Sequence, residues 1–150
     1  MCQCISGVAV LSGETVKVFT STKSDSHNNI REVFGIRDDN SPFADRQTPV
    51  ELIPTTSLTE LKGMKFVFDD KRPDWWTDNM TDDATRQLFS ALNNRWDGNV
   101  FSLDGDINLG RLKSISAGVT LSAGSDLNLY RLTNIPKGVI VKAKNIIYAS

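Results

Sequence analysis

The first four residues hold the most reactive side chains of the chain. Cys2 follows Met1 directly, and a small second residue permits removal of the methionine, which leaves an α-amine beside a thiol. N-terminal-nucleophile amidases use this pair, because the amine acts as the base for its own side chain. Those enzymes have a much larger four-layer fold, and no oxyanion hole is evident here. Hydrolysis by Cys2 is therefore an alternative function, and two small apolar residues in a first strand are the simpler interpretation.

Cys2, Cys4 and His27, the single histidine, form the most evident set of soft metal ligands. Structural zinc sites use four ligands with a Cys-x2–4-Cys spacing, whereas one residue separates these two cysteines. We therefore predict no metal site and no cofactor, and we expect both thiols to stay reduced. An acid–base role for His27 would need a partner that the sequence does not identify, so His27 is expected to be an exposed residue at a helix start.

Two adjacent tryptophans are the strongest candidates for binding. Trp75 and Trp76 cannot face the same way in an extended chain, so one is expected to be buried between sheet and helix and the other partly exposed. An exposed tryptophan is a typical binding anchor, and Arg72 and Asp74 would supply a polar rim. Alternatively, both rings pack in the core where residues 1–98 meet the repeat region, and neither binds a partner. The surrounding aspartates match no EF-hand spacing and indicate a solvated acidic surface or a patch for a basic partner.

The last third of the chain repeats with a period of 20 residues. Leu109 aligns with Leu129, Gly118 with Gly138, and in the truncated last copy Ile147 aligns with Leu127. A fixed short period is typical of solenoids, so we predict a short parallel β-solenoid with coils of about 20 residues over residues 99–150. Leucine-rich-repeat and β-helix geometries fit about equally well. Solenoids bind along their outer faces, where three further binding residues are predicted: Tyr130, Arg131 and Lys113.

Residues 1–98 predict a small α+β domain in the order β-β-α-β-β-α, with an antiparallel sheet and both helices on one face. The first helix is expected to begin at a cap on Asp25 or Ser26 and to end at Gly35. The second is expected to begin at an N-cap on Thr81 and to end at Gly98. Strands are expected over residues 4–11, 14–20, 48–53 and 63–69, the third at an edge because Pro49 and Pro54 bracket it.

Composition sets wider limits. The 150 residues are 39% hydrophobic and 23% charged, with a net charge of −1. No stretch approaches the roughly 18 apolar residues of a membrane span, and no secretory signal is evident, so a cytoplasmic protein without membrane contact is expected. Residues 1–99 carry a net charge of −4 and residues 100–150 of +3. Because the basic residues are sparse and not clustered, direct nucleic-acid binding is not predicted.

Several short motifs together resemble a group of small bacteriophage and prophage proteins. These are Met-Cys-x-Cys-Ile at residues 1–5, Ser-His-x-x-Ile-x-x-x-Phe-Gly at 26–35, Val-Glu-Leu-Ile-Pro at 50–54, Pro-x-Trp-Trp at 73–76, and a Leu-rich repeat ending Ile-Pro-x-Gly-Val at 127–139. The resemblance covers nearly the whole chain and implies a phage accessory protein, expressed in a bacterial cytoplasm, that acts on a host molecule. It implies no catalytic residue.

These observations predict a non-enzymatic binding protein. Its expected target is a host complex, such as an anti-phage defence system of the kind that anti-CRISPR proteins block, or a small anionic signal that it sequesters. One alternative is the Cys2 hydrolase described above. The other is a structural phage component that self-associates into a homo-oligomer through the end of its last repeat.

Overall fold

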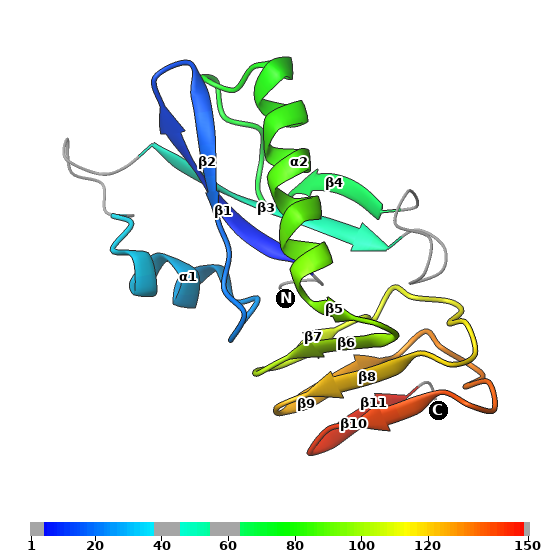
Figure 1. Cartoon of the computed structure of the whole chain (residues 1–150). Coiled ribbons are helices and arrows are strands. Elements are labelled where there is room, and N and C mark those ends of the chain that lie inside the picture. Colours follow the sequence, from blue (N-terminus) through cyan, green and yellow to red (C-terminus); the bar gives the residue numbers. More distant parts are fainter. Residues whose placement is uncertain (1–4, 38–45, 55–63, 149–150) are drawn as a thin grey trace.

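A computed structural model describes residues 5–37, 46–54 and 64–148 of the chain. Within these residues the protein has an α+β fold with two helices and three small sheets (Figure 1). The helix count and the presence of an antiparallel N-terminal sheet agree with the sequence prediction, whereas the architecture of the C-terminal region differs from it.

The N-terminal sheet is antiparallel throughout and has the strand order β2-β1-β3-β4. The strands are β1 (Ser6–Ser12), β2 (Thr15–Phe19), β3 (Gln47–Pro54) and β4 (Met64–Phe68). The prediction that the third strand lies at an edge is wrong, because β3 pairs on both sides. Proline has no N–H to donate, and the nitrogen of Pro49 lies on the side of β3 where β4 ends, so the loss is tolerated. On the same side the Pro49 carbonyl accepts a bond from the amide of Asp69, directly after β4, at 3.1 Å.

The two helices pack against opposite faces of this sheet, so the prediction of both on one face is wrong. Side chains alternate between the faces of a strand. A Cβ placed on Gly7 would meet Leu88 of α2 (Asp78–Asn94) at 3.1 Å, so Gly7 faces that helix. Ser6 and Val8 therefore face the other side, where α1 (His27–Phe34) lies. There Phe19 of β2, which pairs with Val8, packs against Phe34 of α1, with the ring centroids 4.9 Å apart and the rings tilted by 47°.

The boundaries of α1 follow the sequence signals, but those of α2 do not. Ser26 caps α1 and Gly35 ends it in the left-handed conformation, as predicted. Helix α2 begins four residues before the predicted cap, at Thr77, whose hydroxyl accepts a bond from the Met80 amide at 3.4 Å. The hydroxyl of Thr81, the predicted cap, accepts a bond from the indole of Trp76 at 2.8 Å. Helix α2 ends at Arg95. The predicted stop signal, Gly98, lies beyond it with φ 62° between β5 and β6.

The C-terminal region forms two separate small sheets, and the predicted parallel β-solenoid is not the fold found. One sheet is mixed, with the order β10-β8-β6-β5, because β5 runs antiparallel to β6. The other is parallel, with the order β11-β9-β7. The strands are β5 (Trp96–Asp97), β6 (Val100–Leu103), β7 (Ile107–Asn108), β8 (Thr120–Ala123), β9 (Asp126–Leu129), β10 (Ile140–Lys142) and β11 (Asn145–Tyr148). The 20-residue period indicated which strands pair, but it could not indicate the antiparallel strand β5.

One pairing in the parallel sheet is displaced from the sequence repeat. Leu127 of β9 pairs with Ile146 of β11, not with Ile147 as the 20-residue alignment predicts. Lys142 pairs with Ser122 and Asn145 with Asp126, so the step from Lys142 to Asn145 is one residue shorter than the matching step from Ser122 to Asp126. Because neighbouring residues of a strand face opposite ways, this shift places Ile147 on the outer face, opposite Asn128.

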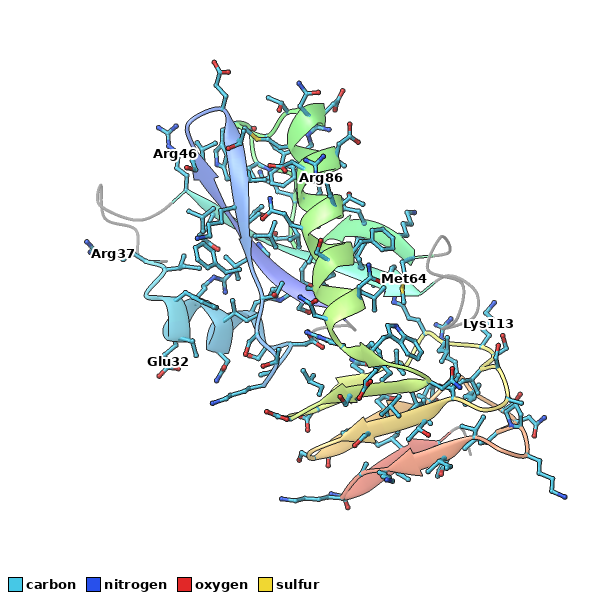
Figure 2. All side chains as sticks on the ribbon, viewed as in Figure 1. Glu32, Arg37, Arg46, Met64, Arg86 and Lys113 are labelled. Carbon is cyan, nitrogen blue, oxygen red and sulfur yellow. The ribbon has the colours of Figure 1, made fainter. Side chains whose placement is uncertain are left out.

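A single hydrophobic cluster joins the N-terminal and C-terminal sheets. It includes Leu88 and Leu92 of α2, Phe101 of β6 and Leu121 of β8, all fully buried. Figure 1 shows α2 running across the N-terminal sheet and leading directly into β5, and Figure 2 shows side chains filling the space between them. No helix among the described residues is long and apolar enough to cross a membrane.

Candidate functional site

A buried polar cluster lies where α1 meets the N-terminal sheet. It consists of His27 from the first turn of α1, Glu51 from the middle of β3 and Asp69 directly after β4. Glu51 pairs in register with Ser6, so both side chains face α1. The Ser26 cap starts the helix one residue before His27 and so aims the imidazole at the sheet. Three segments far apart in sequence therefore place their polar groups together.

The geometry of this cluster is defined by the imidazole of His27. Its Nε2 lies 3.2 Å from the Val50 carbonyl oxygen, and its Nδ1 lies 3.4 Å from Asp69 Oδ2. One ligand atom from each of His27, Glu51 and Asp69 lies within 4.8 Å of the others. His27 and Glu51 are buried, whereas the Asp69 side chain is 39% exposed. The cluster is thus closed by the protein on one side and reaches solvent at Asp69.

The hydrogen bond to Val50 determines the tautomer of His27. A carbonyl oxygen only accepts, so Nε2 carries the proton, and in the neutral imidazole Nδ1 then presents a lone pair to the carboxylate of Asp69. Burial lowers the pKa of His27 below its ordinary value of 6.5, against the raising effects of the Val50 hydrogen bond and the Asp69 charge. The arrangement offers one nitrogen and two carboxylates to a cation.

Next to this cluster, Arg95 and Asp25 form a buried ion pair in which both carboxylate oxygens are directly bound. Arg95, the C-cap of α2, binds both carboxylate oxygens of Asp25 at 2.8 and 2.9 Å, and both side chains are buried. Asp25 also accepts a bond from the Ser6 amide at 3.0 Å. The Arg95 carbonyl accepts a bond from Ser102 of β6 at 3.1 Å. This pair therefore connects β1, the start of α1, α2 and the mixed sheet.

A cavity of about 410 Å³ lies between the segment before α1 and the outer face of the parallel sheet. Its polar lining includes three carboxylates and two amides, from Asp25, Asp106, Asp126, Asn108 and Asn128. The two amide oxygens already accept backbone bonds in their own turns, from Gly110 and Tyr130, so they shape the chain locally. The carboxylates make this cavity unsuitable for an anion.

The two C-terminal sheets end together at strands β10 and β11, which we call the C-terminal edge. Each is the terminal strand of its sheet in the described residues. Large apolar side chains are exposed on these strands: Ile140 at 53%, Ile147 at 46% and Tyr148 at 46%. Residues 127–150 carry four basic side chains and no acidic one. Within the part of the chain that the structure describes, the C-terminal edge thus exposes apolar side chains, carries Lys142 and Lys144, and has no further strand on its outer side.

The predicted tryptophan site is largely part of the core. Trp76 is 4% exposed and packs 4.9 Å from Phe68 and 6.0 Å from Phe66 of β4. Trp75 is half-buried beside it, so Trp75 is the ring of the pair that a partner could reach. Arg72 and Asp74 are exposed, and Arg72 pairs with Asp78 at 3.1 Å.

The other predicted binding residues occupy turns of the C-terminal sheets. Tyr130, which is 60% exposed, and the exposed Arg131 directly follow β9. Lys113 is exposed in the segment between β7 and β8, and Figure 2 shows it pointing away from the sheets. These turns belong to the same repeat region as the C-terminal edge, whereas Trp75 belongs to the connection between β4 and α2.

Sequence reasoning missed most of the buried polar residues. His27 was expected to be exposed, yet it is 4% exposed. No role was predicted for Glu51 or Arg95, although both are buried. One signal was available, since a charged residue between apolar neighbours at Val50-Glu51-Leu52 in a strand is unusual unless it has partners. Cys2 and Cys4, the predicted alternative nucleophile and its neighbour, lie outside the described residues.

Comparisons with known proteins give no relative for this chain: no family model matches it, no curated protein is significantly similar in sequence, and no solved structure is significantly similar.

Proposed function

We propose that this chain is a non-enzymatic binding protein that engages an acidic strand of a partner protein through its C-terminal edge. The observation that carries the proposal is that two terminal strands expose three large apolar side chains and that the charged side chains on and between these strands, Lys142 and Lys144, are both basic. An exposed edge strand offers unpaired backbone groups to another chain, and alternate side chains supply specificity.

The charge of the edge favours a different protein over a second copy of this chain. All charged residues from 127 onward are basic: Arg131, Lys137, Lys142 and Lys144. Of these, Lys142 lies on β10 and Lys144 directly before β11. Pairing two copies edge to edge would therefore bring four cationic groups to one seam, and like charges across a strand pair are destabilising. A partner strand flanked by aspartate or glutamate would complement the same surface and leave the apolar side chains in contact.

The other candidate partners have less support. A small anionic signal would meet the carboxylates of the cavity, which disfavour it. A nucleic acid would pair with the lysines but not with Ile140 and Ile147, whose burial supplies much of the expected affinity. The Cys2 hydrolase receives no support, because Cys2 lies outside the described residues.

The resemblance to phage and prophage proteins supplies the setting of the proposal. It implies a bacterial cytoplasm as the setting and a host component, first of all an anti-phage defence complex, as the partner class to test. Binding without chemistry would act stoichiometrically, by covering a surface that the host complex needs.

Site-specific photo-crosslinking in host cells tests this function. A photoreactive residue at position 147 should capture an acidic host protein, and the same residue at Val33, which is 63% exposed on α1, should not. With the captured protein purified, Ile140→Asp should weaken binding by about 100-fold or more, because it replaces an apolar contact by a like charge. Val33→Asp should leave the Kd unchanged.

Three results would refute the proposal. Crosslinking of position 147 to a second copy of the chain would instead support the self-assembling structural protein. Equal capture at positions 147 and 33 would show non-specific contact. A Kd that Ile140→Asp does not change would show that the partner binds elsewhere, with Trp75 the next position to test.

A further inference from the structure

We propose that His27, Glu51 and Asp69 bind one divalent transition-metal ion, with Zn²⁺ as the ion to test first. This site is independent of the proposed function, because it lies on the N-terminal sheet and involves no residue of the C-terminal edge. The inference goes against the sequence prediction of no metal site, and it uses ligands other than the two cysteines considered there.

The separation of the candidate ligand atoms fits a metal better than a direct ion pair. Two ligands bound at 2.0–2.2 Å in a tetrahedral site lie about 3.4 Å apart. His27 Nδ1 and Asp69 Oδ2 are 3.4 Å apart. A charge-assisted N–H···O bond between the same atoms would be about 2.7–2.9 Å long. The third ligand atom, from Glu51, lies within 4.8 Å of both, so a small rotation of its carboxylate completes the set.

The hydrogen bonds around the ligands are those that metal sites use. A histidine that binds a metal through one nitrogen almost always donates its other N–H to a carbonyl or carboxylate, which fixes the ring and its tautomer. His27 Nε2 meets the Val50 carbonyl in this way and directs Nδ1 into the cluster. The Glu51 carboxylate accepts a bond from the Ser6 hydroxyl at 3.3 Å. Both arrangements orient ligands before an ion arrives.

The chemistry of the donors selects the class of metal. Imidazole nitrogen suits Zn²⁺ and its transition-metal neighbours, whereas Mg²⁺ and Ca²⁺ prefer oxygen alone. Three protein ligands leave a position for water, and the 39% exposed Asp69 side chain gives solvent access to it. A bound ion would also hold the first turn of α1 against β3 and the end of β4.

Metal titration of the full chain, after treatment with a chelator, tests the site. Calorimetry should show one Zn²⁺ bound per chain, and Co²⁺ should give the visible absorption of a four-coordinate site. Asp69→Asn removes one ligand at a partly exposed position and should weaken Zn²⁺ binding by about 100-fold or more, since even changes to groups that only orient a ligand cost 10–100-fold. Asp70→Asn is the matched control, because Asp70 is an exposed carboxylate one residue away and outside the cluster.

A second variant guards against effects of folding. Ser6→Ala removes the hydroxyl that orients Glu51 and should weaken binding by about 10-fold while all three ligands remain. The inference is wrong if the chain binds no stoichiometric Zn²⁺, or if Asp69→Asn binds it as tightly as Asp70→Asn. The latter result would direct attention to Cys2 and Cys4. Neither outcome bears on crosslinking at the C-terminal edge.

Discussion

The outer edge of β2 and the C-terminal edge differ in how their exposed backbone groups and side chains are covered. The outer edge of β2 is covered by a side chain of α2: Gln87 accepts a bond from the Val18 amide at 2.8 Å and donates to the Val16 carbonyl at 2.9 Å. The side-chain amide thus makes the two backbone hydrogen bonds that a neighbouring strand would otherwise make. At the C-terminal edge, β10 and β11 expose Ile140, Ile147 and Tyr148 instead.

The contrast separates an edge protected from association from one left open to it. Natural sheets shield their edges with charges, bulges or covering groups, because a bare edge recruits other chains. At β2 the shield is the Gln87 side chain, which covers the backbone groups. At β10 it is limited to the charge of Lys142, and Ile140 stays exposed for a partner to cover. Both edges belong to one body, because the buried Asp25–Arg95 pair and a shared hydrophobic cluster join the two regions.

Breaking the buried ion pair should have the largest effect, because it joins the parts that carry the two edges. Arg95→Met leaves the Asp25 carboxylate buried without its guanidinium and should lower the free energy of unfolding by about 3–5 kcal/mol. Urea denaturation followed by circular dichroism measures this change. If the two regions were independent, the N-terminal and C-terminal parts of the variant would unfold in separate transitions.

A surface pair provides the control for this variant. Arg86 binds Asp83 at 2.7 Å on α2, and its side chain is 72% exposed, so Arg86→Met should change stability far less. The double variant Asp25→Asn with Arg95→Met should recover part of the loss, because no buried charge remains. Equal losses for Arg95→Met and Arg86→Met would contradict the connecting role assigned to Arg95.

Packing should weaken from the centre of the mixed sheet toward its open edge. Leu121 of β8 is fully buried, and Leu121→Ala should cost about 2–5 kcal/mol of unfolding free energy. Val141 pairs with it on β10 but is only partly buried, so Val141→Ala should cost about 1 kcal/mol. Thermal and urea unfolding of the two variants compare the positions. Similar losses would mean that β10 is packed as tightly as β8 and is no open edge.

The sequence predicted the N-terminal elements well where local signals decide them. Ser26 and Gly35 marked α1, because capping is a property of a few neighbouring residues. Pro49 misled, since whether a proline disrupts a sheet depends on where the neighbouring strand ends. The one-residue shift in the register of β11 could not be predicted either. A single missing residue hardly alters an alignment of leucines, but it turns the side chain of Ile147 to the other face of the strand.

The candidate sites were harder to predict than the elements. His27, Glu51 and Asp69 are separated by 24 and 18 positions and meet only because β1, β3 and β4 pair in a particular register. No spacing rule for ligands covers such a set. The exposure of Tyr130, Arg131 and Lys113 could be predicted, because the repeat separates inward from outward positions. Trp76 was ambiguous, and its burial followed from contacts with β4.

Removing the shield of β2 should cost less stability than Arg95→Met or Leu121→Ala but should have a direct effect on association. Gln87→Ala deletes two hydrogen bonds to backbone groups and should cost about 1–2 kcal/mol. The Val18 amide should then exchange with deuterium faster, and the edge of β2 should resemble that of β10. Ser90→Ala, on an exposed position of the same helix, is the matched control and should change neither exchange nor stability. Sedimentation at increasing concentration should show self-association of Gln87→Ala but not of Ser90→Ala, because only the former exposes the unpaired backbone groups of β2. If Val18 exchanges at the same rate in both variants, Gln87 does not shield β2, and the difference between the two edges has another cause.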